Sequence, residues 1–160
     1  MRGLAIGLFL ASYLFGLSDS QIDTVKKIRE IAKKHTAYPT TIAGISIVES
    51  SAGANPNRVG DDGKSFGVLQ IQTATVRWLS TEWRELEWTN GLSDHDIGRL
   101  LLTDLEFSVM VACLRFEQVR QYHGYFKAVS AYNGGYDNHR YVRKVNKAKR
   151  LINREVRNGK

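Results

Sequence analysis

One acidic residue, Glu49, comes directly after the apolar run "TIAGISIV" and directly before a segment rich in glycine and small polar residues. If residues 41–49 form a helix, Ile42, Ile45 and Glu49 lie on one stripe of it, so the carboxyl group sits on an apolar face. Burial and the carbonyl end of the helix both raise the pKa of such a group. The helix end contributes about 0.3–1 kcal/mol, less than one pKa unit, whereas burial can contribute several units. Burial should therefore dominate.

A carboxylic acid that stays protonated near neutral pH can act as a general acid. Glycosidases need such a group to protonate the leaving oxygen of the bond they cut. The sequence therefore indicates a catalytic acid at Glu49. The alternative is a glutamate that only caps its helix or pairs with a nearby arginine.

Two further segments have a composition that suits carbohydrate. Residues 60–70, "GDDGKSFGVLQ", are rich in glycine, which lets the backbone approach a ligand closely, and they lack the spacing of a phosphate-binding loop. Residues 130–141, "SAYNGGYDNHRY", add three tyrosines and two asparagines, which can stack on sugar rings and bond acetamido groups. Taken alone, each segment could also be an ordinary turn or helix–loop junction.

No metal or cofactor is expected. The four histidines have no metal-ligand spacing, and the single cysteine, Cys113, cannot form an internal disulfide. Cys113 lies in the apolar stretch "VMVACLRF", where a buried, inert thiol is expected.

The elements that must position these residues are helical. A chain of 160 residues with 42% hydrophobic and 24% charged residues can form one domain with a real core. Helical spacing predicts helices over about 19–35, 41–49, 73–78, 104–123, 125–132 and from 139 onward. Ser93 is the predicted N-cap of a further helix, and Thr103 is the predicted N-cap of the helix over 104–123. Residues 51–67 are expected to form a loop. The expected fold is mostly α, without repeats.

The N-terminal residues form a separate segment. Residues 3–17 contain no charge and follow Arg2; this run is short for a membrane span but typical of the core of a signal peptide. We expect residues 1–18 to be an apolar leader, either a signal peptide or a weak signal anchor, with a short helix, and residues 19–160 to be the catalytic domain. The alternative is an apolar helix packed in a soluble assembly.

The net charge of +7 is concentrated at the C-terminus. Residues 139–160 contain nine Lys or Arg and one acid, so residues 1–138 sum to −1. Such a basic helix suits an anionic partner such as an envelope surface, a cell-wall polymer or nucleic acid. The alternative is a solvated amphipathic helix without a partner.

Several short motifs occur in the order found in the lytic transglycosylase (SLT domain) family, and together the chain resembles that family. They are "ES" at 49–50, "GVLQI" at 67–71 with "TAT" at 73–75, "AYNGG" at 131–135 and "YVRKV" at 141–145. Residues 101–116 resemble the family's long helix, and the resemblance covers about residues 25–150. It implies a goose-type lysozyme-like helical domain with a cleft.

The resemblance also implies a reaction and roles for single residues. Glu49 would be the catalytic acid and then the base, and Tyr141 would point toward its carboxyl. The other substrate-binding residues would be Ser65, Gly67, Val68, Gln70, Tyr132 and Asn133. The reaction would cut the β-1,4 bond between N-acetylmuramic acid and N-acetylglucosamine in peptidoglycan and close a 1,6-anhydro ring. This route needs one protein carboxylate, whereas most glycosidases use two.

The chain departs from the family at the loop after the glutamate. Asp61 and Asp62 stand where serines are common, and this loop is closer to goose-type lysozymes, in which an aspartate at the position of Asp61 is a candidate to orient water. Gln72 stands where those lysozymes carry an aspartate. Asp61 is therefore a possible second acid. A transglycosylase remains the favoured interpretation, and a hydrolytic muramidase is the alternative.

Non-enzymatic functions fit the sequence less well. A wall-binding module has no need of Glu49 on an apolar stripe. A nucleic-acid-binding virion protein could use the basic segment, but that segment has few interleaved aromatic residues, so nucleic acid is not an expected partner.

The expected location is the periplasm. Residues 1–18 would engage the export machinery or the inner membrane, and the basic tail would bind anionic envelope polymers. The apolar leader favours a phage endolysin over a virion-borne enzyme or the small transglycosylase of a secretion apparatus.

Overall fold

The computed structural model describes residues 16–55 and 58–157, and the expected apolar N-terminal helix lies outside this range. The expectation of a mostly α fold is confirmed. Its helices are α2 (Asp19–Ala32), α3 (Pro39–Ser50), α4 (Thr73–Leu79), α5 (Asp94–Thr103), α6 (Leu105–Tyr132) and α7 (His139–Arg157), with short 3-10 helices η1 (Asp61–Gly63) and η2 (Arg84–Gly91). No helix in the described ranges is both long and apolar enough to cross a membrane.

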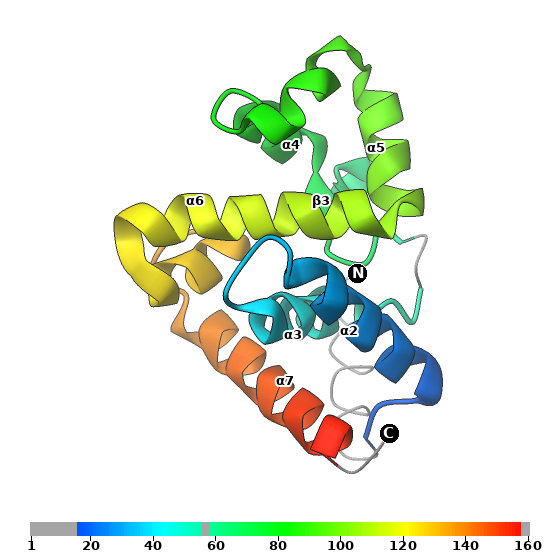
Figure 1. Cartoon of the computed structure of the whole chain (residues 1–160), viewed down its shortest axis with the longest axis vertical. Coiled ribbons are helices and arrows are strands. Elements are labelled where there is room, and N and C mark those ends of the chain that lie inside the picture. Colours follow the sequence, from blue (N-terminus) through cyan, green and yellow to red (C-terminus); the bar gives the residue numbers. More distant parts are fainter. Residues whose placement is uncertain (1–15, 56–57, 158–160) are drawn as a thin grey trace.

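Helix α6 runs between two groups of elements. Helices α2, α3 and α7 pack on one side of it, and α4, α5 and η2 lie on the other (Figure 1). One core continues through both groups, because Ile28 and Ile45 on one side and Leu79 and Ile97 on the other have no exposed surface. Each such side chain contributes roughly 1.5–3 kcal/mol by leaving water.

The segment predicted as a loop contains part of a small sheet. Strands β1 (Val59–Gly60), β2 (Ser65–Phe66) and β3 (Ile71–Gln72) are antiparallel in the order β1-β2-β3. Each strand has two residues, too few for an alternating pattern to mark it in the sequence. The sheet packs beside α4 and α5 and brings the chain back toward the end of α3.

Two of the predicted helix starts can be compared with the caps observed. Ser93 caps α5 as predicted, accepting a hydrogen bond from the Asp96 N–H at 3.1 Å. Thr103 is not the cap of α6. It is the last residue of α5, and Asp104 caps α6 by accepting from the Phe107 N–H at 3.0 Å, since a carboxylate there is an equally good acceptor.

The folded domain begins before Asp19. Leu17 is buried, and Ser18 and Gln21 form a reciprocal capping box at the start of α2. Residues 17 and 18 therefore contact the domain, although they belong to the segment expected as a leader.

Two glycines affect the helices, one by interrupting α6 and one by allowing α3 and α7 to approach closely. Gly124 interrupts α6 with φ +80° and ψ 173°, which divides it into the two helices predicted over 104–123 and 125–132. At Gly44, α3 and α7 approach so closely that a Cβ atom would lie 3.1 Å from Lys149 Cγ and 3.3 Å from the Val145 carbonyl oxygen.

Candidate active site

Glu49 is the penultimate residue of α3. Ile42 and Ile45, on the same stripe, are fully buried, as the spacing predicts. Helix α3 ends at once, because Ser51 adopts a left-handed conformation with φ 55° and its N–H bonds the Ile47 carbonyl at 3.0 Å. The glutamate thus stands where an apolar helix gives way to a turn.

The carboxyl group of Glu49 accepts a short hydrogen bond from the Tyr141 hydroxyl, with 2.5 Å between the oxygens. Burial raises the pKa of Glu49 to about 7. The Tyr141 bond and the charges of Arg115 and Arg58 lower the pKa by less than burial raises it, and the charge of Asp61 adds a smaller raising effect. Glu49 can therefore exist in both its protonated and its ionised form near neutral pH.

Among the residues that the structure describes, no arginine forms an ion pair with Glu49, the alternative considered from the sequence. The guanidinium of Arg58 donates instead to the backbone carbonyl of Glu49 at 2.8 Å. This bond satisfies a carbonyl at the end of α3.

Tyr141 is held at the start of α7 by the loop before it. Its N–H donates to Asn138 Oδ1 at 3.0 Å, and the Asn138 N–H donates to Ser130 Oγ at 2.6 Å. Burial raises the pKa of Tyr141 well above its ordinary value, so the phenol keeps its proton and remains a donor to Glu49. The hydroxyl lies where the family resemblance led us to expect it.

The loop between β2 and β3 is tied to the end of α3. Ser50 Oγ donates to the Val68 carbonyl at 2.7 Å, and Gln70 Nε2 donates to the Gly67 carbonyl at 2.8 Å. Gly67 has φ +73°, and a Cβ atom there would lie 2.3 Å from the Leu101 carbonyl oxygen, so only glycine fits. This loop is consequently fixed beside the Glu49 helix.

The side chains predicted to bind substrate differ in exposure. Val68 and Tyr132 are buried, and the Tyr132 hydroxyl donates to the Leu69 carbonyl at 3.0 Å. Gln70 is partly exposed and Asn133 is exposed, with Asn133 Oδ1 accepting from Asn138 Nδ2 at 3.2 Å. The side chains of Gln70 and Asn133 are therefore accessible to a ligand. The binding roles of all the residues in the set remain predictions.

Asp61, the possible second acid, has a small electrostatic effect on Glu49. Its exposed carboxylate accepts a hydrogen bond from the buried Ser65 hydroxyl at 2.6 Å. Asp61 and Asp62 both have left-handed backbones, with φ 49° and 54°, which costs energy for residues with a side chain. Gln72 is exposed and lines a cavity of about 380 Å³ with Lys64, Phe66 and Asp94.

Two arginines near the Glu49 carboxyl group were not identified from the sequence. Arg58 lies in the loop, and Arg115 projects from α6, where its Nη2 donates to the Ala131 carbonyl at 3.1 Å and its guanidinium stacks 4.5 Å from the Tyr132 ring. Arg115 is the only charged residue in "VMVACLRF", a signal that could have drawn attention to it.

The remaining reactive groups do not join this site. Cys113 is fully buried, and burial raises the pKa of its thiol to about 12, as expected for an inert core residue. Over residues 16–55 and 58–157, no group of three or more His, Cys, Asp or Glu side chains could hold a metal ion.

The chain was also compared with known proteins. A search of curated proteins and a search of solved structures each gave no match. The sequence model of the family described as "Transglycosylase SLT domain" matches residues 26–154, a stretch that includes Glu49, the loop beside it and Tyr141. The chain therefore belongs to the SLT transglycosylase domain family, a family of enzymes that cleave peptidoglycan.

Proposed function

We propose that the protein is a lytic transglycosylase that cuts the β-1,4 bond between N-acetylmuramic acid and N-acetylglucosamine and leaves a 1,6-anhydro end. One observation carries the proposal: Glu49 has a pKa of about 7 and its carboxyl bonds the Tyr141 hydroxyl at 2.5 Å. Such a group can give up a proton and take one back at neutral pH, as a single-carboxylate mechanism requires.

In the first step, protonated Glu49 donates its proton to the glycosidic oxygen as the bond to C1 of the muramyl sugar breaks. The acetamido oxygen of the same sugar shares the positive charge that develops at C1. The Tyr141 hydroxyl stabilises the carboxylate formed on Glu49, because a hydrogen bond to an ionised acceptor is stronger than one to a neutral acceptor.

In the second step, the Glu49 carboxylate removes the proton from the C6 hydroxyl of the muramyl sugar. The C6 oxygen then attacks C1, displaces the acetamido oxygen and closes the 1,6-anhydro ring. Glu49 is protonated again, and no water is consumed. Asn133 and Gln70 are the side chains best exposed to hold the sugars during these steps.

A hydrolytic muramidase is the second candidate, and Asp61 favours it. Its exposed carboxylate has a small raising effect on the pKa of Glu49, so a second acid lies within electrostatic range of the first. In that case Asp61→Asn should abolish product formation while leaving the fold intact, whereas a transglycosylase should keep most of its activity.

Mass spectrometry of the muropeptides released from purified peptidoglycan distinguishes the candidates. The wild type should release products lighter by one water than hydrolysis products, and Glu49→Gln should release none. Products with reducing ends would support the muramidase. Release by Glu49→Gln at the wild-type rate would contradict any catalytic role of this residue.

We further propose that the enzyme acts from the periplasm, exported or held at the inner membrane by residues 1–18, and that it opens the wall locally or during phage-driven lysis. The uncharged run over residues 3–17 supports this location. Fractionation of cells that express the full chain should recover it in the periplasm or with the inner membrane. Recovery in the cytosol would contradict the proposed location without affecting the proposed chemistry.

A further inference from the structure

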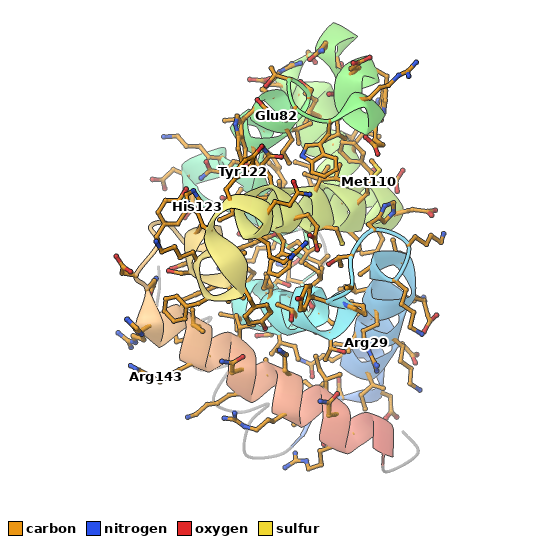
Figure 2. The ribbon with its side chains drawn as sticks, turned by 60° about the vertical axis from the view of Figure 1, so that its left-hand side comes forward. Arg29, Glu82, Met110, Tyr122, His123 and Arg143 are labelled. Carbon is orange, nitrogen blue, oxygen red and sulfur yellow. The ribbon has the colours of Figure 1, made fainter. Side chains whose placement is uncertain are left out.

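The exposed side of α7 carries charges of one sign only. Five of its basic residues are exposed and recur at intervals of three and four, and we call them the basic stripe: Arg140, Arg143, Lys147, Arg150 and Arg154. Residues 3.5 apart on average follow one face of a helix, so these cations line up over about 21 Å, at 1.5 Å per residue. Figure 2 shows Arg143 on the side of α7 that faces away from α3.

The helix cannot rotate to hide this face. Its opposite side is in the core, where Tyr141, Val145, Ala148 and Ile152 are buried, and it packs closely on α3 at Gly44. The one acidic residue of α7, Glu155, is itself buried beside Arg154, with 3.1 Å between Arg154 Nη2 and Glu155 Oε1. The outer surface of α7 is therefore fixed in place and uniformly positive.

Helix α2, another surface helix of the protein, carries exposed charges of both signs. On α2, the acids Asp19, Asp23 and Glu30 are exposed among the bases Lys26 and Lys27. Mixed signs are typical of a helix that faces water only, whereas a single sign favours an extended anionic partner.

The position of Gly16 indicates which kind of anionic partner the basic stripe binds. A Cβ atom on Gly16 would lie 3.4 Å from Glu155 Oε1, so the chain reaches the domain beside the last turns of α7. Figure 1 shows the start of α2 and the end of α7 at the same end of the molecule. Residues 3–15, which carry no charge, directly precede Gly16 in the sequence. An apolar segment next to a basic surface is the combination of two weak signals that gives stable membrane binding.

We propose that the basic stripe binds the anionic headgroups of a phospholipid membrane, so that α7 lies along the membrane surface. Tyr141 is on the opposite face of α7 and holds Glu49 beyond it. A membrane against the stripe would therefore lie on the side of α7 that faces away from Glu49. This inference concerns membrane binding only, so its test does not depend on whether the proposed reaction is correct.

The test measures how the full-length protein partitions onto phosphatidylcholine vesicles with and without phosphatidylglycerol. The stripe variant combines Arg140→Gln, Arg143→Gln and Arg150→Gln, which leaves the Arg154–Glu155 pair intact. A matched control removes three exposed cations elsewhere, through Lys26→Gln, Lys27→Gln and Arg84→Gln. Cleavage of soluble glycan fragments and the circular dichroism spectrum verify that each variant is folded.

The wild type and the control should prefer vesicles that contain phosphatidylglycerol, and the stripe variant should lose most of this preference, by roughly tenfold to a hundredfold in the partition coefficient. The preference should also weaken as salt increases. Equal losses in the stripe variant and the control would overturn the proposal, because net charge alone would then explain the binding. It would also be overturned if the stripe mattered for purified wall polymer or duplex DNA but not for the vesicles.

Discussion

At the scale of single residues, the chemistry of this protein depends on how Glu49 is solvated. Three interactions favour its ionised form, namely the Tyr141 hydroxyl and the charges of Arg115 and Arg58, yet burial outweighs them and holds the pKa at about 7. Removing any one of these contacts should therefore change the acidity of Glu49 in a direction that can be stated in advance.

Tyr141→Phe should move the alkaline limb of the pH–activity profile to higher pH. The Tyr141 hydrogen bond lowers the pKa of Glu49, so its loss raises that pKa and keeps the acid protonated at higher pH. Turnover should also fall, by roughly tenfold to a thousandfold, because the carboxylate formed in the first step loses its donor. The measurement is kcat/KM against pH, with Tyr136→Phe, at an exposed tyrosine, as the control. A limb that stayed in place would show that Tyr141 does not act on the acid.

Glu49→Gln should stabilise the fold above neutral pH. The ordinary pKa of 4.5 applies when the chain is unfolded and a pKa of about 7 when it is folded. Between these values the folded state binds the extra proton, so wild-type stability falls as pH rises, by at most about 3 kcal/mol. The glutamine variant has no such penalty, and its melting temperature should exceed that of the wild type at pH 8 but not at pH 4. Glu87→Gln, at an exposed position, should show no such pH-dependent gain.

At the scale of elements, the helices could be predicted from sequence because apolar residues recur at helical spacing over several turns. The clearest case is α2, where Ile22, Val25, Ile28 and Ala32 recur at helical spacing and are all buried. The strands could not be predicted, because two residues are too few to show an alternating pattern and their pairing depends on how the loop folds back on itself. The cap at Asp104 was missed because Thr103 beside it is an equally suitable residue type.

Gly67→Ala should destabilise the protein by at least about 2 kcal/mol, because the new methyl group would collide with the Leu101 backbone and the backbone would be strained at φ +73°. The loop beside Glu49 would have to move, so activity should fall as well. Chemical denaturation measures the first effect and muropeptide release the second. Gly91→Ala is the matched control, since a Cβ there meets open space, and it should stay close to wild type.

At the scale of the whole molecule, the active site is assembled from three distant parts of the chain. The end of α3, the loop before β3 and the start of α7 meet through the bonds of Ser50 to Val68 and of Glu49 to Tyr141. The family motifs indicated which segments meet. They did not reveal Arg115 or the part that Asn138 plays in holding Tyr141, because those contacts depend on how α6 and its following loop pack.

Tyr132→Phe should weaken the connection between α6 and the loop before β3. The Leu69 carbonyl would lose its donor inside the protein, which costs about 1–3 kcal/mol, while the ring that stacks on Arg115 would remain. Thermal unfolding should register the loss, and kcat should fall more than KM rises, since the loop positions the reacting groups. Tyr122→Phe, whose side chain is largely in solvent, serves as the control. Unchanged stability would mean that water replaces the hydroxyl without cost.

The close approach of α3 and α7 at Gly44 links helix spacing to acidity. Val145, whose carbonyl oxygen would lie 3.3 Å from a Cβ atom at this position, is one turn after Tyr141 on α7. Any side chain larger than hydrogen at Gly44 would act as a spacer between the two helices and draw the phenol away from Glu49. The proton affinity of Glu49 therefore depends on the absence of a side chain at Gly44, five residues before it on the same helix.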